Sequence, residues 1–234
     1  MSDLPAGAAA VPGWYCKLAS LGDFAHRRLP PEFVHACDDW LAAAMRGGRE
    51  ALGERWLEVY LTAPLLRFGW APGIVDARWW FGLLMPSCDS VGRYFPLLIA
   101  QAREHAPRDR IALDHLERWF AHLADAAVQT LQDGQGSIDL LEAALRDAPP
   151  WPTPGRVSTL HSGRTTDSEH HRLGRAAPLS HWLHAIAMQD FAGRLAGRSL
   201  WWRVTPAGSD DALDILQGLP DGVGFAELLM GMRA

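Results

Sequence analysis

Three strand-like segments between residues 64 and 103 limit most strongly how this chain can fold. They read PLLRFGWAPG (64–73), ARWWFGLLMP (77–86) and YFPLLIAQAR (94–103). Each is rich in aromatic and aliphatic residues and is bounded by proline, glycine or polar residues, as is typical of strands. Because the loops between them are short, we expect these segments to pair as antiparallel hairpins.

Amphipathic helices are expected on both sides of this region of the chain. Residues 31–48 place apolar residues on one face, start with a proline and end at Gly47-Gly48, and a second helix follows through 49–61. Residues 110–134 carry apolar residues at helical spacing over their whole length. A shorter helix is expected from Ser137 to about Asp147.

The two ends of the chain add further elements. Residues 13–18 and 199–204 are predicted strands, and the stretch from Phe24 to Leu29 is a predicted helical turn. Helices are expected over 178–197 and over the terminal 225–232. Strands in a central cluster and at each end, with helices between them, favour an α/β layered domain with a mixed sheet.

The composition indicates one domain with a large core. The chain has 234 residues, of which 48% are hydrophobic and eleven are tryptophans. A single domain over residues 1–234 is therefore expected, with residues 1–11 flexible and the polar segment 161–175 as a mobile loop. The three cysteines form no CxxC pair, and no signal peptide or membrane-spanning run is apparent, which predicts a cytoplasmic protein without disulfides.

Charge and motif spacing exclude several functional classes. The net charge is −5 with no basic block, so nucleic acid is not an expected partner. The ten histidines, including His170-His171 and the pair His181 and His184, lack a metal-ligand spacing, and no metal or cofactor is expected. No GxSxG motif occurs, and Cys88 is interpreted as an inert buried thiol.

A polar stretch interrupts the apolar segments in LMPSCDSVGRYFPLLIA (84–100). It contains Ser87, Asp89 and Arg93, and Asp23 follows the first predicted strand in LGDF. An arginine between apolar segments needs a carboxylate, so Arg93 is expected to be partly desolvated and paired with Asp89 or Asp23. A structural ion pair is the favoured interpretation, and recognition of a ligand or partner is the alternative.

Several of these segments together resemble a known family. GWYCKLASLGDFAHRRLP, PSCDSVGRYFPLLIA, SLWW and GLP are similar to the N-terminal domain of TagF, also called ImpM, an accessory protein of the bacterial type VI secretion system. The resemblance runs from about Pro12 to the C-terminus. The chain departs from the family's usual GKLP at Cys16 and Ala19, and residues 150–178 match no family pattern.

The resemblance implies a three-layer α/β/α sandwich and a regulatory function. Members of this family are post-translational repressors of type VI secretion that act through a forkhead-associated scaffold protein. A binding module of this kind would use Asp23, Ser87, Asp89, Arg93 and the pair Trp201-Trp202 as its functional surface or as the frame that supports it. A small-molecule sensor or hydrolase-like enzyme with a pocket at Asp23, Ser87, Asp89 and Arg93 is the alternative.

Overall fold

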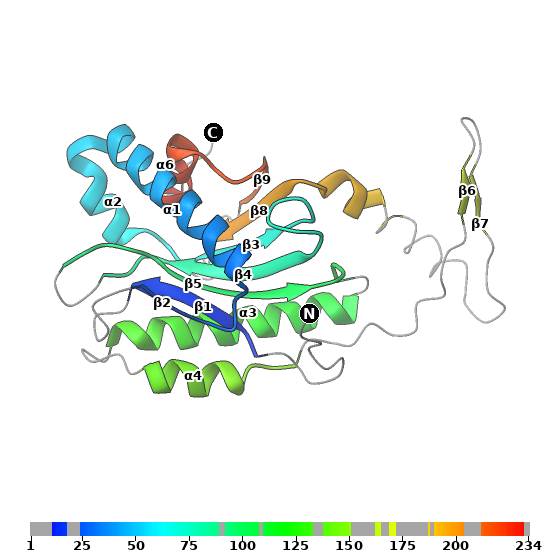
Figure 1. Cartoon of the computed structure of the whole chain (residues 1–234), viewed down its shortest axis with the longest axis horizontal. Coiled ribbons are helices and arrows are strands. Elements are labelled where there is room, and N and C mark those ends of the chain that lie inside the picture. Colours follow the sequence, from blue (N-terminus) through cyan, green and yellow to red (C-terminus); the bar gives the residue numbers. More distant parts are fainter. Residues whose placement is uncertain are drawn as a thin grey trace.

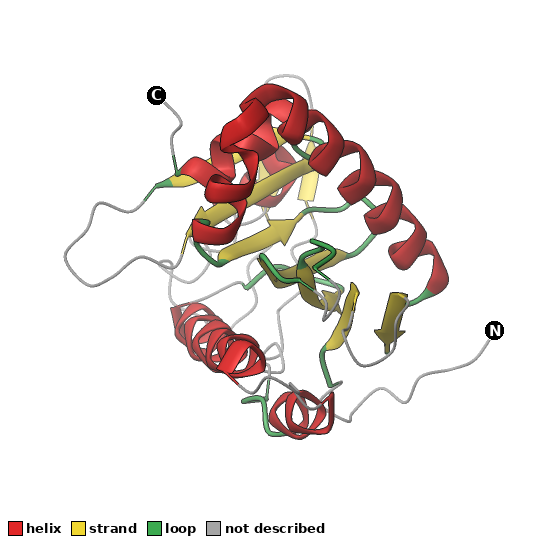
Figure 2. Ribbon diagram, turned by 90° about the vertical axis from the view of Figure 1, so that its left-hand side faces the viewer, coloured by secondary structure: helices red, strands yellow, loops and turns green. Residues whose placement is uncertain are grey.

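A seven-stranded sheet with helices on both faces forms the centre of the molecule (Figures 1 and 2). The structure is a computed structural model, and it describes residues 11–17, 24–88, 92–107, 110–132, 138–150, 162–164, 169–171, 187, 190–203 and 212–231. The strands follow one another across the sheet in the order β2-β1-β5-β4-β3-β8-β9. They are β1 (Gly13–Lys17), β2 (Phe24–Arg27), β3 (Leu66–Trp70), β4 (Trp79–Met85), β5 (Leu97–Arg103), β8 (Arg198–Arg203) and β9 (Leu213–Gln217).

Neighbouring strands of this sheet all pair antiparallel. The predicted hairpins β3–β4 and β4–β5 are confirmed, with Phe68 opposite Gly82 and Gly82 opposite Ala100. The prediction of a mixed sheet is wrong. The long connection through the helices that follow β2 does bring β3 into the sheet in the direction of β2, but β1, β5 and β4 lie between the two strands, so no parallel pair forms.

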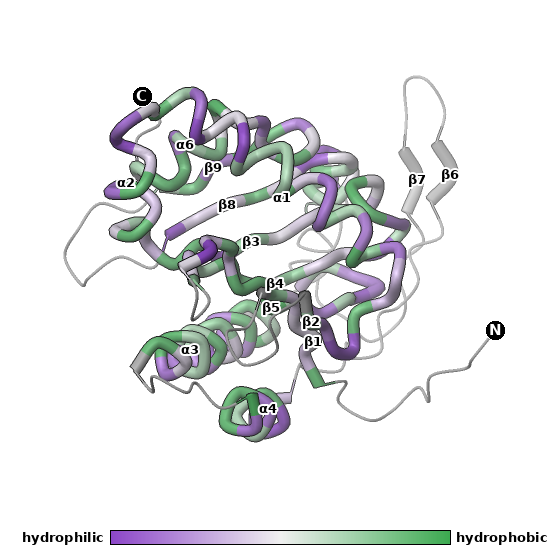
Figure 3. The backbone as a smooth tube through the Cα atoms, turned by 60° about the vertical axis from the view of Figure 1, so that its left-hand side comes forward, coloured by the Kyte–Doolittle hydropathy of each residue, from purple (hydrophilic) through white to green (hydrophobic). Residues whose placement is uncertain are grey.

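Two helical layers cover the two faces of the sheet, so the three-layer α/β/α architecture is confirmed (Figures 2 and 3). One layer holds α1 (Pro31–Leu52), the 3-10 turn η1 (Gly53–Arg55), α2 (Trp56–Thr62) and α6 (Gly222–Met230). The other layer holds α3 (Arg110–Gln132) and α4 (Ile138–Arg146). Within the described residues, no helix is both long enough and apolar enough to cross a membrane.

Successive side chains of a strand point to opposite faces of the sheet, so the hydrophobic core has two parts, one under each helical layer. In β4, Trp80 packs toward the α1 side, whereas Trp79 and Phe81 pack toward the α3 side. The same alternation separates the adjacent tryptophans of β8. Trp201 is fully buried 5.5 Å from the Trp40 ring, and the partly buried Trp202 meets the Phe120 ring edge-on at 5.1 Å.

Helix α1 does not end at Gly47-Gly48 as predicted but continues to Leu52. The two glycines lie where α1 meets α6. A Cβ atom on Gly47 would lie 2.9 Å from the Gly222 Cα atom, and one on Gly48 would lie 2.9 Å from the Trp56 ring. Glycine is therefore required here for close helix packing, and the helix ends instead at Gly53, whose φ is +53°.

Two further predictions about elements need correction, and one strand was missed. The stretch 24–29 contains strand β2 and not a helical turn, because its residues pair with β1. The polar segment 161–175, expected to be a mobile loop, contains the paired strands β6 (Ser162–Arg164) and β7 (Glu169–His171). Edge strand β9 was not predicted at all.

A candidate interaction groove beside the β4–β5 loop

The loop between β4 and β5 is fixed to the sheet at its base by hydrogen bonds. The backbone N–H of Phe95 donates to the carbonyl oxygen of Ser87 over 3.1 Å, and Cys88 forms an isolated antiparallel bridge with Tyr94. The Tyr60 hydroxyl, from α2, donates to the same Ser87 carbonyl (3.0 Å) and accepts from the Ser87 N–H (3.2 Å). Ser87 is thus a structural residue through its backbone, and the loop is attached to α2.

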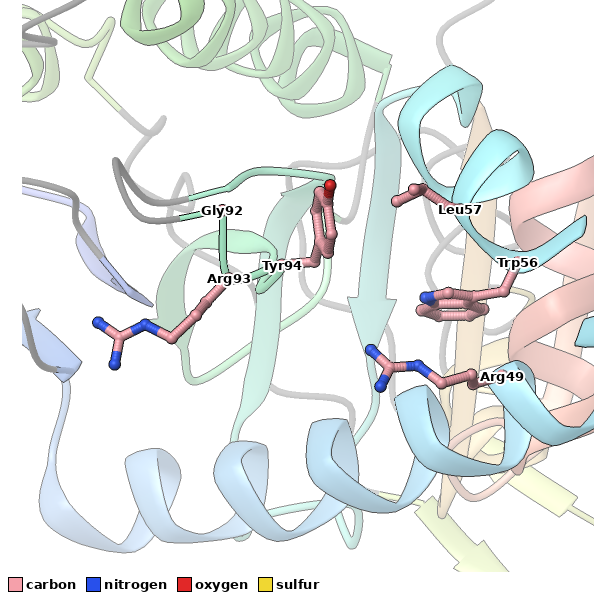
Figure 4. Close-up of a pocket in the computed structure, with 6 residues that line it drawn as sticks. All are labelled: Arg49, Trp56, Leu57, Gly92, Arg93 and Tyr94. Atoms are coloured by element: carbon pink, nitrogen blue, oxygen red, sulfur yellow. The ribbon is translucent and has the colours of Figure 1, made fainter. Parts of the chain in front are cut away.

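An open groove of about 520 Å³ lies between this loop and the helices of the α1 layer (Figure 4). Arg49 at the end of α1 and Trp56 and Leu57 of α2 form one wall, and their side chains point toward the loop. Residues 92–94 form the other wall, where the Tyr94 ring faces the groove while the Arg93 side chain points away from it. The groove therefore combines apolar and cationic groups.

Trp56 is a buried residue in the wall of the groove. Its ring lies 5.4 Å from the Tyr60 ring, which in turn meets the Tyr94 ring edge-on at 5.8 Å. The Arg49 guanidinium lies over the indole at 5.7 Å from its centroid. Trp56 is 5% exposed, and its buried Nε1–H has no hydrogen-bond partner among the described residues. An indole donor without an acceptor is unusual in a folded protein.

The structure places the residues predicted from the sequence in different environments. Arg93 is exposed at the groove and its side chain points away from it, so the prediction that it is enclosed between apolar segments is wrong. Asp23 and Asp89 lie outside the described residues, and the predicted ion pair stays a prediction. Trp201 belongs to the core, and Trp202 packs against α3.

A buried carboxylate that the sequence reading missed lies on the opposite face of the sheet. Glu142 of α4 is 1% exposed and accepts hydrogen bonds from both terminal nitrogens of Arg28 (2.7 and 2.8 Å) and from the Trp14 indole. Burial alone would raise the pKa of Glu142, but the hydrogen bonds from Arg28 and Trp14 and the charge of Arg28 lower it to about 2. Arg28 itself has a φ of +58°, an uncommon value for a residue other than glycine.

The position of Glu142 on its helix was a usable signal. Ile138, Leu141 and Leu145 form an apolar stripe at helical spacing, and Glu142 falls on that stripe, four residues after Ile138. A carboxylate on an apolar face requires a cationic partner. Arg28 could not be identified as that partner, because 114 residues separate the two.

The three cysteines lie in two different environments. Cys16 and Cys37 are buried, and burial raises the pKa of both thiols, that of Cys16 to about 12. Cys88 is exposed, which contradicts its interpretation as a buried thiol, because it lies beyond the end of β4. Within the described part of the chain, no three His, Cys, Asp or Glu side chains gather as metal ligands would.

Comparisons with known proteins agree with this architecture. The family model described as "TagF N-terminal domain, Type VI secretion system-associated" matches residues 13–147. The crystal structure of PA0076 from Pseudomonas aeruginosa PAO1 is 31% identical to this chain, with a TM-score of 0.70, and the match covers 95% of this chain and 96% of that one. The search of curated proteins found no match.

Proposed function

This chain belongs to the family of TagF N-terminal domains associated with type VI secretion, and from that membership we propose that it is a post-translational repressor of the secretion system. It acts by binding and not by catalysis. Its partner is the forkhead-associated scaffold component of the apparatus. Binding holds that component in an arrangement that does not support secretion.

The groove beside the β4–β5 loop is the observation that supports this proposal best. Arginine and aromatic residues are enriched at protein interfaces, and the groove presents Arg49, Trp56 and Tyr94 together. The outer face of α2 continues it with Leu57 and Leu61, which are 42% and 55% exposed. Exposed apolar side chains beside an open groove are typical of a surface that a partner covers.

The proposal is tested by changing the amount of this protein in the host bacterium. We expect overproduction to reduce secretion by the type VI system, while the cellular amounts of the apparatus proteins stay constant, because repression acts after translation. Deletion of the gene should raise secretion. Lower amounts of apparatus proteins would contradict the post-translational mechanism, and unchanged secretion in both strains would contradict repression itself.

A double substitution at the groove and on the adjoining face of α2 links this effect to the structure. Leu57→Ser with Leu61→Ser replaces two exposed side chains, so the change should leave the melting temperature nearly unchanged. We expect the variant to lose repression. The control is Leu113→Ser with Val128→Ser on α3, which also replaces two exposed apolar side chains but lies on the opposite layer, and it should repress normally.

A further inference from the structure

One wall of the groove contains a hydrogen-bond donor, the Trp56 indole N–H, that has no acceptor among the described residues. The Trp56 indole presents its nitrogen toward the groove, next to the guanidinium of Arg49 (Figure 4). The Trp56 Nε1–H lacks an acceptor, and Arg49 forms no ion pair with a carboxylate of the described residues. Leaving a buried donor unpaired is costly, so an acceptor that enters the groove would relieve this cost.

The charge around this wall favours an anionic acceptor. The residues that line the groove include two arginines and no carboxylate within the described part of the chain. An ionised oxygen that accepts from a guanidinium and an indole N–H makes stronger hydrogen bonds than a neutral oxygen does.

The apolar side chains of the groove indicate which kind of ligand would supply the anionic group. Leu57 and Tyr94 face each other across the groove, and exposed Leu61 follows one turn later on α2. A free small anion would leave these side chains uncovered. A protein segment with an acidic residue next to a leucine-sized side chain would cover them and satisfy Arg49 and Trp56 at the same time.

From these observations we infer that the groove recognises an acidic–apolar segment of a partner protein, with a Glu or Asp carboxylate bound by Arg49 and the Trp56 Nε1–H. This inference rests on the proposed function and names the chemistry of the segment that is bound. The Arg49 side chain is exposed. Exposed side chains change rotamer within picoseconds to nanoseconds, so Arg49 can shift with the incoming carboxylate and open access to the indole N–H.

The test uses ¹⁵N-labelled protein and the peptide acetyl-Leu-Glu-Leu-amide, followed through the indole N–H signals of the eleven tryptophans. The Trp56 signal is assigned by its loss in Trp56→Phe. We expect this signal to move progressively with the glutamate peptide and to move far less with acetyl-Leu-Gln-Leu-amide. Arg49→Gln should weaken peptide binding at least about tenfold, as expected for a hydrogen bond to a charged group. Arg49→Lys should restore part of the affinity.

The control variant is Arg46→Gln, which removes an exposed arginine of the same helix that does not line the groove. It should bind the peptide within about twofold of the wild type, a difference too small for a lost hydrogen bond to a charged group. Equal shifts with both peptides, or unchanged affinity in Arg49→Gln, would overturn the inference. So would a stronger response to inorganic phosphate alone, or a shift that follows protein concentration, which would indicate a second copy of this chain.

The peptide measurement uses no component of the secretion system. If the peptide binds as expected but the protein does not affect secretion, the proposed function is wrong, whereas the inference that the groove binds an acidic–apolar segment is supported. If secretion is repressed but the Trp56 signal does not respond to the peptide, the proposed function is supported and the inference about the groove is wrong.

Discussion

Glu142 is the residue at which charge and stability are most directly linked. Its pKa is about 2 in the folded protein against an ordinary value of 4.5, so the ionised carboxylate stabilises the fold by roughly 3 kcal/mol. Because the folded pKa is depressed, this contribution is complete above about pH 4.5 and is lost as the pH falls toward 2. Glu142→Gln should lower the free energy of unfolding at pH 7 by about 3 kcal/mol.

Chemical denaturation between pH 7 and pH 2.5 measures this contribution. The wild type should lose its advantage over Glu142→Gln as the pH falls, and the exposed Glu50→Gln should behave like the wild type throughout. A constant difference between wild type and Glu142→Gln at all pH values would mean that the charge of Glu142 does not stabilise the fold.

The cysteines give a second prediction at the residue scale. Cys16 and Cys37 are 1% and 0% exposed with raised thiol pKa values, whereas Cys88 is exposed. Iodoacetamide at pH 7 should therefore modify Cys88 first, and the other two only after unfolding. Mass spectrometry without reductant counts the labels. Loss of two labels after unfolding would reveal a disulfide and contradict the expected reducing compartment.

The sequence singled out the segment 84–100, and residues 92–94 of that segment line the groove, but the environment of Arg93 was not predicted correctly. Arg93 was expected between apolar neighbours, because the chain on either side is apolar, yet its side chain is exposed. Arg49 and Trp56 were not predicted as site residues. Their juxtaposition with Tyr94 depends on how α2 packs against the β4–β5 loop through Tyr60, a contact that helical spacing does not indicate.

At the scale of elements, the crossing of α1 and α6 depends on glycine. A Cβ atom on Gly222 would collide with the backbone of Gly47 and Gly48, which cannot move aside as a flexible side chain can. Gly222→Ala should therefore destabilise the protein by about 1–3 kcal/mol, the range for overpacking. The control Gly193→Ala meets nothing within 4 Å and lies in helical residues 190–195, so it should be neutral or stabilising by up to about 1 kcal/mol.

Thermal or urea unfolding of the two variants separates these effects. Equal stability of Gly222→Ala and wild type would show that α1 and α6 can separate at no cost. The same crossing explains why the end of α1 was predicted wrongly, since a pair of glycines ordinarily indicates a helix end and here permits a close contact instead.

At the scale of the whole molecule, long apolar periodicity was the most reliable part of the sequence signal. It located α1, α3 and α4 and the strands β3, β4 and β5, because each of these buries a continuous face. The edge strands β2 and β9 were missed or misread, since an edge strand has only one neighbour and needs less apolar sequence. Strand direction was misjudged because it depends on connections that no local pattern specifies.

Binding between this chain and the forkhead-associated scaffold protein of the same bacterium tests the central claim most directly. Isothermal titration of the two purified proteins gives the affinity, with the Leu57→Ser, Leu61→Ser variant alongside. We expect saturable binding by the wild type, and binding at least about tenfold weaker by the variant because it lacks the exposed apolar side chains in and beside the groove. No heat of binding with the folded wild-type protein, or equal affinity for wild type and variant, would contradict the account.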